Sequence, residues 1–370
     1  MQTVLVTGIA GNLGTRLLPQ LAGFRVVGVD VHPPQHEPHN APASEPAMDF
    51  HAIDLAREQS SHELVDLLFT TQAAAVVHLA FVIDPVRSGV LDVARQWQIN
   101  VAGTARVMEA IGEYQRRGGG PVEKFIFPSS VSVYGPETPP LVKEDFPLGG
   151  HTLPYAIHKR EADQVAQLRA SWIAPCHTYI LRPHIFVGAS VQNYLVGALR
   201  GTATGAGARA RKLRERGKRL PMLLPRGEKY RAKKYQFVHV DDMARLIAWI
   251  LRAPAPAANP TIVNVAARGE PISLARCAEI GHAEIKAVPG KWLCRLILRA
   301  MWRLGISGFP PEALPYMIGS FTMDTARLRA LLGPDYERVM QYTVESALAD
   351  SFETPPAAAP AALTQESRVG

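Results

Sequence analysis

The segment VTGIAGNLG, at residues 6–14, constrains the fold more than any other part of the sequence. It leaves a buried-strand pattern, TVLVTG (3–8), and enters a helical pattern, LGTRLLPQLAG (13–23). In such a loop the first glycine permits a tight turn, the second lets the backbone approach a pyrophosphate, and the third lets helix and strand pack closely. Free N–H groups at the helix start favour an anion. The segment therefore predicts a dinucleotide-binding unit with these binding residues: Gly8, Gly11, Asn12, Leu13 and Gly14.

An aspartate closes the second predicted strand, RVVGVD (25–30). Asp30 lies 22 residues after Gly8, where a carboxylate accepts hydrogen bonds from the adenosine ribose hydroxyls. The same carboxylate repels the 2′-phosphate of NADP. Asp30 therefore favours NAD as the cofactor, against the alternative of an aspartate that only closes a turn.

Strand and helix patterns alternate through the first half of the chain. Apolar runs at 74–80, 124–130 and 177–183 predict further strands, with helical patterns between them. This alternation predicts an α/β protein with a Rossmann doubly wound parallel sheet, covered by helices on both faces. After residue 183 the alternation weakens, although 236–240 and 261–266 still resemble strands. A smaller C-terminal substrate-binding lobe is expected there.

These patterns divide the chain into three parts. Residues 1–182 with 236–266 are expected to form the NAD-binding Rossmann domain, and 183–235 with 267–353 the substrate lobe. The tail 354–370 has the composition of a disordered segment. The proline-rich stretch 32–50 is expected to be a loop.

Positive charge is concentrated in one segment. The net charge is +7, yet residues 209–234 alone contain 12 Lys and Arg against Glu215 and Glu228. Such a run predicts a solvated, mobile loop rather than a nucleic-acid-binding face, with a clamp for a phosphate or an acidic partner as the alternative. A second basic pattern, KWLCRLILRAMWRLG (291–305), predicts an amphipathic helix whose Trp/Leu/Ile face packs on the lobe, opposite its Lys and Arg residues. Contact of this helix with a membrane surface ranks second.

The remaining composition excludes several classes of protein. The three cysteines, at positions 176, 277 and 294, have the spacing of neither a metal site nor a disulfide framework. The N-terminal sequence has no signal-peptide core, and no apolar run approaches the roughly 18 residues of a membrane span. We expect a cytoplasmic protein that acts on a small molecule, without a metal and without a nucleic-acid or membrane partner.

Motifs along the chain resemble those of the extended short-chain dehydrogenases/reductases, the NAD-dependent epimerase/dehydratase family. Besides the glycine loop they are HAIDLA (51–56), VVHLAF (76–81), NVAGT (100–104), IFPSSVSVYG (126–135), LPYAIHK (153–159) and VHVDDMARLI (238–247). Phe81 replaces a residue that is commonly small in the family. The resemblance spans about two-thirds of the chain and implies an NAD-dependent oxidoreductase or isomerase. It places these further residues at the cofactor: Asp54, Leu55, Leu79, Ala80, Ser129, Tyr155, Lys159 and Pro183.

The resemblance also implies the catalytic residues. Ser130 matches the family's catalytic serine, with Ser132 as a weaker alternative, and precedes Tyr155 by 25 residues, much as in UDP-galactose 4-epimerases. Tyr155 and Lys159 are four residues apart, so a helix presents them on one face. Because tyrosine titrates near pH ~10, it needs Lys159 and the positive nicotinamide to stabilise its phenolate before it can act as a base. Asn100 is expected to support a water or a backbone kink beside this pair.

Two positions depart from the pattern of nucleotide-sugar members. LRPHIFVG (181–188) carries Ile185 where those members have an asparagine that contacts the substrate diphosphate, and Tyr235 stands near the place of an arginine with the same role. Isoleucine cannot bond a phosphate, whereas arginine is well suited to it. An apolar residue after LRP resembles members that act on apolar substrates, such as 3β-hydroxysteroid dehydrogenases. The residues expected at the substrate are therefore Ser130, Ser132, His184 and Ile185, with His184 more often a packing residue than a catalyst.

Three functions stay open at this point. They are a sugar epimerase or dehydratase, a 3β-hydroxysteroid-dehydrogenase-like enzyme on an apolar alcohol or ketone, and a non-catalytic NAD-binding regulator. The complete set of Ser130, Tyr155 and Lys159 favours an enzyme. The resemblance further implies a homodimer through the helices near 90–116 and 155–170, by residues that could equally face the sheet: Val101, Val107, Met108, Ala162 and Val165.

Overall fold

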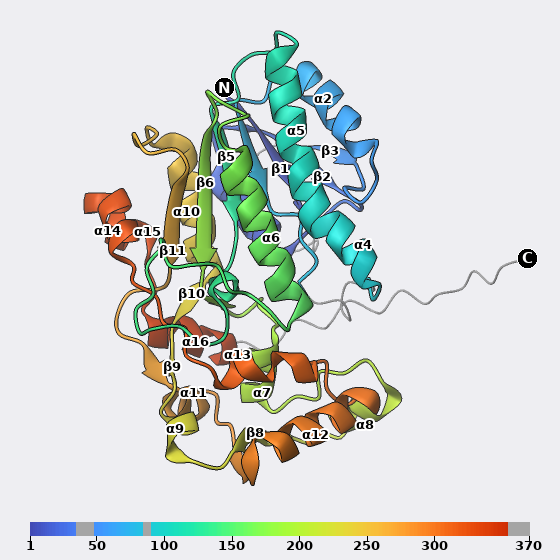
Figure 1. Cartoon of the computed structure of the whole chain (residues 1–370), viewed down its shortest axis with the longest axis vertical. Helices are drawn as coiled ribbons and strands as arrows, with labels where there is room; N and C mark the ends of the chain where they lie inside the picture. The colour runs from blue at the N-terminus through green and yellow to red at the C-terminus, as the bar shows by residue number, and fades with distance from the viewer. Residues whose placement is uncertain (35–47, 84–89, 354–370) are drawn as a thin grey trace, which may run out of the picture.

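The computed structural model describes residues 1–34, 48–83 and 90–353 (Figure 1). The disorder expected for 354–370 and most of the loop expected over 32–50 concern residues outside this description. The last part of that predicted loop is a strand instead, β3 (Met48–Ala52), which pairs with β2. Its sequence alternates apolar Met and Phe with polar Asp and His, as a half-buried strand does. The pattern is too short to stand out after a proline-rich stretch.

A sheet of seven strands lies at the centre, in the order β11-β6-β5-β4-β1-β2-β3. Every pair of neighbours is parallel. Several strands are buried along their whole length, as parallel strands covered on both faces must be. Besides β3, the strands of the sheet are β1 (Thr3–Thr7), β2 (Arg25–Asp30), β4 (Ala75–His78), β5 (Lys124–Pro128), β6 (His177–Pro183) and β11 (Thr261–Val265). The predicted strands at these places are present, and the chain order reverses direction at β1, between β4 and β2.

Helices cover both faces of the sheet (Figure 1). On one face, α2 (Ser60–Thr71), α5 (Gly103–Arg116) and α6 (Pro154–Arg169) pack side by side over one apolar core. On the other, α1 (Asn12–Leu17) packs against α10 (Val240–Arg252) over a second core, and the short C-terminal helices join them. These are α14 (Ala326–Leu332) and α15 (Tyr336–Val339), and single turns of 3-10 helix occur at Leu18–Leu21, Val131–Tyr134, Pro311–Ala313 and Gly333–Asp335.

The helix expected near 90–116 is interrupted. It consists of α4 (Val93–Trp97), a π-helical turn over Gln98–Ala102, and α5. A π-helical turn inserts one extra residue into the helical ladder and often marks a functional position. Asn100 lies in this turn, which agrees with the expectation of a backbone kink at that residue.

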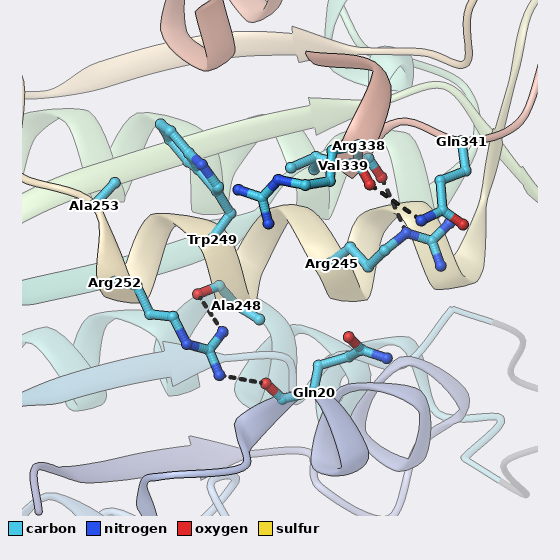
Figure 2. A pocket seen from close by; sticks show the side chains of 9 residues that line it. All are labelled: Gln20, Arg245, Ala248, Trp249, Arg252, Ala253, Arg338, Val339 and Gln341. Carbon is cyan, nitrogen blue, oxygen red and sulfur yellow. Dashed lines mark hydrogen bonds between the residues drawn. The ribbon is translucent and has the colours of Figure 1, made fainter. Parts of the chain in front are cut away.

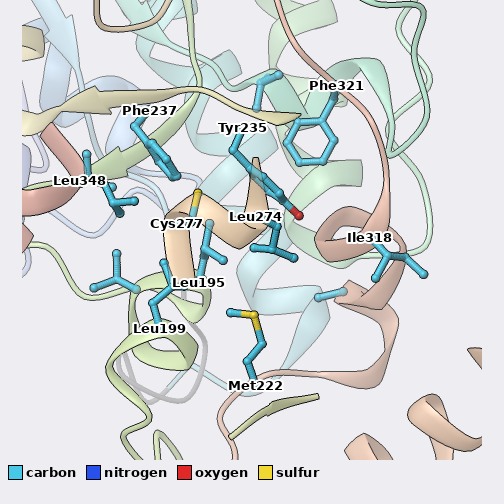
Figure 3. Close-up of a cluster of buried hydrophobic side chains, with 14 of the residues drawn as sticks. Leu195, Leu199, Met222, Tyr235, Phe237, Leu274, Cys277, Ile318, Phe321 and Leu348 are labelled. Atoms are coloured by element: carbon cyan, nitrogen blue, oxygen red, sulfur yellow. The ribbon is translucent and has the colours of Figure 1, made fainter. Parts of the chain in front are cut away.

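A second group of elements forms a lobe around its own apolar core, whose centre Figure 3 shows. Three small two-stranded sheets support it: β10 with β7, β12 with β9, and β13 with β8. The strands are β7 (Ile185–Val187), β8 (Met222–Pro225), β9 (Lys234–Tyr235), β10 (Phe237–His239), β12 (Ile272–Ser273) and β13 (Ile285–Val288). The helices are α7 (Tyr194–Arg200), α8 (Ala208–Glu215), α9 (Glu228–Arg231), α11 (Leu274–Ile280), α12 (Gly290–Arg303), α13 (Leu314–Ile318) and α16 (Val344–Glu353).

The prediction of a mobile loop over 209–234 is wrong. This segment contains α8, β8, α9 and β9, and β8 pairs with β13 in the lobe. Met222 and Leu224 are buried in the lobe core, so apolar positions between the charges fix the segment in place. The charged side chains themselves are mostly exposed. Because they are so numerous in the sequence, the few apolar residues that anchor the segment were overlooked.

The predicted faces of α12 also need correction. Cys294 and Leu298 are its buried residues, and they point toward β8 and the lobe core. Trp292 is 75% exposed and Leu296 47% exposed, so both lie on the same side as the basic residues. The expectation that a Trp/Leu/Ile face packs inward, opposite the charges, holds for Leu298 and in part for Leu293 and Ile297, but not for Trp292 or Leu296.

Most residues considered for a dimer seam lie inside the chain. Val101, Val107, Met108 and Ala162 are buried, and all but Val101 belong to the core between the helices and the sheet. Val165 is partly buried against the same core. Val107, Met108, Ala162 and Val165 thus face the sheet, which is the alternative that the sequence left open.

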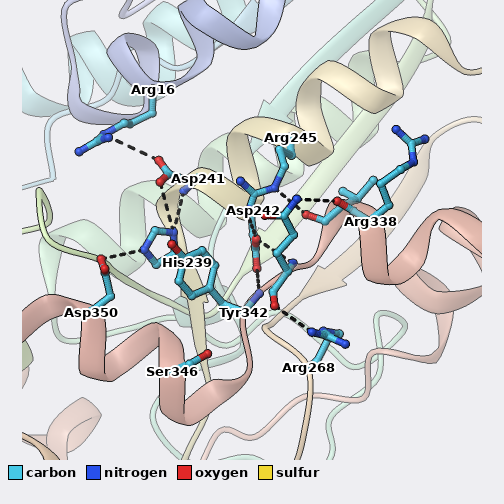
Figure 4. A network of polar contacts seen from close by, with 12 residues as sticks. Arg16, His239, Asp241, Asp242, Arg245, Arg268, Arg338, Tyr342, Ser346 and Asp350 are labelled. Carbon is cyan, nitrogen blue, oxygen red and sulfur yellow. Dashed lines mark hydrogen bonds and ion pairs between the residues drawn. The ribbon is translucent and has the colours of Figure 1, made fainter. Parts of the chain in front are cut away.

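A polar network joins α10 to the C-terminal segment (Figure 4). The Asp242 carboxylate accepts hydrogen bonds from the backbone N–H groups of Gln341 (3.0 Å) and Tyr342 (3.1 Å), and it also pairs with Arg245. The His239 ring stacks on Tyr342 at 3.7 Å and contacts Asp350 at 3.1 Å. The motif VHVDDMARLI is thus a clamp that holds α16 and the segment before it beside α10.

A buried ion pair ties α6 to the sheet. Arg182, on β6, donates two hydrogen bonds of 2.9 Å to Asp163, on α6, and the two side chains are only 1% and 0% exposed. Asp163 also accepts a 2.6 Å hydrogen bond from Ser129. Arg182 donates to the Tyr134 hydroxyl at 2.8 Å, and Tyr134 donates to Asn264 on β11 at 2.7 Å. The network therefore connects α6 with the carboxyl ends of three strands.

Replacing Asp163 with asparagine should strongly destabilise the fold. Asp163→Asn leaves the guanidinium of Arg182 buried without a counter-charge, which typically costs about 3–5 kcal/mol. The matched control is Asp49→Asn, because Asp49 pairs with Arg25 at 3.7 Å with both side chains about half exposed. An exposed pair contributes about 0–1 kcal/mol. Denaturant titration measures both, and equal losses of unfolding free energy would contradict the role given to Asp163.

Candidate active site

The glycine loop between β1 and α1 forms a tight turn. Gly8 has φ +73°, and a Cβ there would lie 2.4 Å from the backbone nitrogen of Ala80. A Cβ on Gly14 would lie 2.4 Å from the Ile9 carbonyl oxygen, whereas one on Gly11 would meet only the Gly8 oxygen, at 3.2 Å. Gly8 and Gly14 are thus required by close packing of the protein itself. Gly11 faces open space, as a position that must leave room for a pyrophosphate does.

The other residues predicted for the loop border it. Asn12 is exposed and donates a hydrogen bond to the Ser190 carbonyl at 3.1 Å, and Leu13 is partly buried against the core under α10. Asp30, at the end of β2, accepts a hydrogen bond from the Ala10 N–H at 3.0 Å and one from the Val31 N–H at 2.8 Å. Burial raises the pKa of Asp30, and these two hydrogen bonds act in the opposite direction. The carboxylate lies beside the loop, where it could accept from a ribose hydroxyl.

The strands on either side complete this edge of the sheet. Leu79 and Ala80 follow β4 and are partly buried next to Gly8. Asp54 forms a 2.9 Å ion pair with Arg95, just before the π-helical turn, and Leu55 is buried beside α5. The pairing with Arg95 was not expected. Together with the loop and Asp30, these residues form an arrangement that fits a dinucleotide laid across the carboxyl ends of the strands.

Three serines follow β5 and take different partners. Ser129 is committed to Asp163, as described above. The Ser130 hydroxyl caps the following 3-10 turn by accepting from the Ser132 N–H at 3.1 Å, and the Ser132 hydroxyl contacts it at 3.0 Å. Ser130 also lies close enough to Tyr155 to oppose the rise in the pKa of that tyrosine. Of the two predicted candidates, Ser130 is the one that acts on the tyrosine.

Tyr155 and Lys159 lie one turn apart near the start of α6. The Lys159 amine donates a 2.7 Å hydrogen bond to the Pro128 carbonyl at the end of β5. Leu153 and Pro154 place the helix start at this point, because proline suits the first helical position. The helix therefore brings both predicted side chains to the carboxyl end of β5, next to Ser130.

Burial dominates the titration of both groups. It raises the pKa of Tyr155 to about 12, and the neighbouring Ser130 acts against that shift. It lowers the pKa of Lys159 to about 7, and the charge of Asp163 acts against it. Ser130 does not offset the effect of burial, so positive charge must come close to the hydroxyl to lower the pKa of the tyrosine.

Phe81 covers the lysine, which sequence reasoning did not foresee. The Lys159 nitrogen lies 3.6 Å from the centroid of the Phe81 ring, and that ring meets Tyr155 edge-on at 6.0 Å. Phe127 lies on another side of the amine, at 4.9 Å. The only signal in the sequence was that Phe81 replaces a small residue. Asp163 was also missed, although its spacing of four residues from Lys159 places it on the same face of α6.

Asn100 fixes the segment that follows β4. Its amide bonds both backbone groups of Val82, accepting at 2.6 Å and donating at 3.1 Å, and lies 3.3 Å from His158 on α6. It thus anchors the backbone beside Phe81 and one helical face of α6. Below it, buried His78 bridges the hydroxyls of Thr7 and Thr104 at 2.7 and 3.0 Å. Burial lowers the pKa of His78 to about 3, so this histidine is neutral and structural.

The segment after β6 is apolar. Pro183 is buried at the end of the strand. His184 stacks on Phe321 with centroids 5.3 Å apart, and its Nδ1 accepts from the Ile185 N–H at 2.9 Å. Burial lowers the pKa of His184 to about 3, which agrees with a packing role. Ile185 is partly buried against the lobe core, and the hydroxyl of Tyr235 is bonded to the Met317 carbonyl.

A hollow of about 410 Å³ lies elsewhere, on the outer side of α10 (Figure 2). It contains none of the predicted site residues, and its three arginines already have partners. Arg245 donates to the Val339 carbonyl at 3.0 Å, Arg252 to the Gln20 carbonyl at 2.8 Å, and Arg338 pairs with Asp335 at 2.8 Å. Tyr155 and Lys159, whose pKa values burial shifts strongly, lie at the carboxyl edge of the sheet instead, and that edge is the candidate site. Within the described ranges, no cluster of His, Cys, Asp or Glu could hold a metal ion, and no helix could cross a bilayer.

Curated relatives match part of this chain. A UDP-glucose 4-epimerase of Bacillus subtilis (strain 168) is 33% identical over 169 residues, which cover 44% of this chain and 46% of the relative. A UDP-glucose 4-epimerase of Dictyostelium discoideum is 29% identical over 170 residues, with the same two shares. The chain thus spans about half the length of the curated relatives it matches.

Solved structures match nearly all of it in fold. MoeE5 in complex with UDP-glucuronic acid and NAD superposes with a TM-score of 0.62 at 21% identity, over 95% of this chain and 98% of that one. The UDP-glucose 4-epimerase of Thermus thermophilus in complex with NAD gives 0.63 at 19%, over 95% and 99%. At these identities the likeness shows the fold, and it confirms the predicted Rossmann class.

The description of the matching family is "NAD dependent epimerase/dehydratase family", and its model covers residues 4–266. This range includes the glycine loop, Asp30, the three serines and the Tyr155–Lys159 pair. The predictions of the family, of an enzyme and of NAD as cofactor are confirmed at that level. From the extent of this match, the chain belongs to the NAD dependent epimerase/dehydratase family.

Proposed function

We propose that the protein is an NAD-dependent enzyme that transfers hydride at a carbinol carbon, with Tyr155 as the acid and base. The observation that carries this proposal is that α6 brings Tyr155 and the buried Lys159, one helical turn apart, to the carboxyl end of β5 beside Ser130. A regulator that only binds NAD needs no such arrangement. The glycine loop, Asp30 and Lys159 would hold the cofactor, with Lys159 donating to the nicotinamide ribose.

Each residue has a distinct part in the reaction. Ser130 would donate a hydrogen bond to the substrate oxygen and fix it beside Tyr155. Tyr155 takes the hydroxyl proton when the alcohol is oxidised and returns it when the ketone is reduced. NAD, when bound, accepts the hydride that leaves the same carbon. Asn100 and the π-helical turn act indirectly, by holding the backbone at Val82 and the adjoining Phe81.

The proton chemistry depends on coupling between Tyr155 and Lys159. A tyrosine with a pKa of about 12 is about 5 pKa units from neutrality, which corresponds to roughly 7 kcal/mol. Positive charge close to the hydroxyl in a site of low dielectric must supply that difference. Because a phenolate also favours protonation of the lysine, the two groups would titrate as a pair. The pKa of about 7 for Lys159 places this exchange near physiological pH.

Two substrate classes fit this reaction. The relatives named UDP-glucose 4-epimerase, and MoeE5 with UDP-glucuronic acid, support epimerisation or dehydration of a nucleotide sugar. The partly buried Ile185 and the buried, stacked His184 favour an apolar alcohol or ketone, as in 3β-hydroxysteroid dehydrogenases. We place sugar epimerisation first, because the named relatives share it, and keep the apolar substrate as the alternative that Ile185 supports.

The division of labour within the chain is part of the proposal. Residues 1–182 with 236–266 would bind NAD, and 183–235 with 267–353 would bind the substrate.

We also propose that the protein is a homodimer, joined through the outer faces of α5 and α6. Trp172, just after α6, is 70% exposed and could contribute. Light scattering should give twice the chain mass, and a monomeric mass at micromolar concentration would refute the dimer.

Removing the Tyr155 hydroxyl should abolish turnover. Tyr155→Phe deletes the proton donor and acceptor, and loss of a general acid or base costs roughly 10²–10⁴-fold in rate. NAD affinity should stay near that of the wild type. The control is Tyr114→Phe, which removes a buried hydroxyl bonded to Gln72, remote from the site. Assays with nucleotide sugars and apolar alcohols decide the matter, and a Tyr155→Phe protein with wild-type turnover would disprove the role.

Filling the space at Gly11 should block the cofactor. Gly11→Val places methyl groups where the backbone must approach the pyrophosphate, so NAD affinity should fall by about tenfold or more. Gly120→Val is the matched control, because a Cβ there makes only ordinary contacts of 3.4 Å, far from the loop. Calorimetric titration with NAD measures both. Unchanged affinity in Gly11→Val would show that the loop does not hold the phosphates.

Exposing Lys159 to water should shift the pH dependence of NAD affinity to higher pH. Desolvation is the main cause of its lowered pKa, so Phe81→Ala should raise that pKa toward the ordinary value. A lysine is charged below its pKa, and a charged donor binds ribose hydroxyls more strongly. NAD affinity should therefore decline with rising pH near pH 7 in the wild type and at higher pH in Phe81→Ala.

The control for this variant is Phe69→Ala, on the distant helix α2. Its profile should coincide with that of the wild type. A midpoint for Phe81→Ala that moves to lower pH would mean that the cation–π contact outweighs desolvation, contrary to this account.

A further inference from the structure

The exposed side of α12 has a regular composition. Pairs of one basic and one apolar residue recur every four positions, from the first turn of α12 to the residue after it: Lys291–Trp292, Arg295–Leu296, Arg299–Ala300 and Arg303–Leu304. A spacing of four residues keeps these pairs on one face of a helix. All eight side chains are exposed, with Trp292 at 75%, Leu296 at 47% and Leu304 at 47%. We call this set the α12 face.

The α12 face has no acidic partner on its own helix. Residues 285–311 contain five Lys and Arg and no Asp or Glu. Among the described residues, no ion pair is recorded for the four basic residues of the face. The opposite side of α12 is fully used, since Cys294 and Leu298 are buried in the lobe. The exposed tryptophan and leucines therefore do not contribute to the apolar core of this chain.

A second basic helix lies at the end of the α12 face. The N–H of Gly205 donates to the Ile306 carbonyl at 2.9 Å, and the N–H of Gly207 to the Gly305 carbonyl at 3.0 Å, so α8 begins where α12 ends (Figure 1). Residues 205–227 carry eight Lys and Arg against a single acid, Glu215. The basic side chains along α8 and the turn after it are exposed. The two helices therefore concentrate positive charge at the end of the lobe away from the seven-stranded sheet.

We propose that the α12 face, flanked by the charge of α8, docks the protein on a membrane surface that carries anionic lipid headgroups. A helix with apolar side chains set among Lys and Arg binds in the interfacial plane, where its apolar groups enter the headgroup region and its cations meet lipid phosphates. Tryptophan favours that boundary. Docking of this kind needs no spanning helix. It leaves the sheet edge with Tyr155 and Lys159 outside the contact.

The exposed apolar residues decide between partners of similar charge. A nucleic acid would also attract the cations of α8 and α12, but phosphate contacts give no role to exposed leucines. A bilayer can interact with both residues of each basic–apolar pair, since lipid phosphates bind the cation and the headgroup region accommodates the apolar side chain. From the sequence, membrane contact by α12 ranked behind packing of its apolar face on the lobe, because Trp292 was expected to pack inward. Trp292 is exposed instead, so membrane contact becomes the favoured role of this face.

Flotation of the full-length protein with lipid vesicles tests the proposal. Vesicles of equimolar phosphatidylcholine and phosphatidylglycerol should bind it at about 0.15 M salt, whereas phosphatidylcholine alone should not. Arg295→Glu with Arg299→Glu should weaken the binding by roughly 25-fold, since each cation contributes roughly fivefold. Trp292→Ala with Leu296→Ala, which keeps every charge, should weaken it by roughly tenfold.

Matched controls alter exposed residues elsewhere. Leu141→Ala removes an exposed apolar side chain elsewhere, and Arg57→Glu with Arg116→Glu makes the same change in net charge. Both should bind vesicles like the wild type. The proposal is overturned if the protein ignores anionic vesicles, if the controls lose as much binding as the α12 variants, or if Trp292→Ala with Leu296→Ala binds unchanged. Binding to a DNA or RNA duplex in place of vesicles would equally overturn it.

Discussion

The buried pair of Asp163 and Arg182 is the interaction on which the candidate site depends. Arg182 belongs to β6 and Asp163 to α6, so their two hydrogen bonds fix the rotation and height of α6 against the sheet. Asp163 also holds Ser129, the residue before Ser130. Lys159 and Tyr155 lie one and two turns earlier on the same helix. A single carboxylate therefore sets the relative positions of the serine strand and the helix with the tyrosine and the lysine.

The same carboxylate influences the chemistry. Burial alone would leave Lys159 with little charge near neutral pH, and Asp163 is the group that opposes this loss. Phe81 and Phe127 exclude water from the amine, while the Pro128 carbonyl accepts from it. Tyr155 is partly buried, and this burial makes it a weaker acid. The site thus holds a tyrosine and a lysine whose charged forms are each disfavoured by burial.

The sequence was most informative where a local pattern has a local cause. The glycine loop, the strands β1, β2, β4, β5, β6 and β11, and the helix start at Tyr155 follow from short-range periodicity and from glycine and proline. Reasoning failed where long-range contacts decide. The partner of Asp163 is 19 residues away on another element, and the cover of Lys159 by Phe81 joins segments 78 residues apart. Neither pairing has a periodic signal.

The high density of basic residues led to the wrong prediction of a mobile loop in the lobe. The segment 209–234 is folded because a few apolar residues, such as Met222 and Leu224, anchor it beneath an exposed basic surface. In α12 the alternation of basic and apolar residues fits two helical faces, and only packing against β8 shows which one is buried. Amphipathic patterns give the existence of a helix with more certainty than its orientation.

The most direct test of the central claim is the ionisation of Tyr155 itself. Magnetic resonance of isotope-labelled tyrosine, followed through a pH titration with and without NAD, can report it, and the Tyr155→Phe protein identifies the signal. The account predicts a pKa near 12 for the protein alone and a fall toward neutrality when NAD binds. A pKa that stays near 12 with NAD bound would contradict the assignment of Tyr155 as the proton-transfer residue.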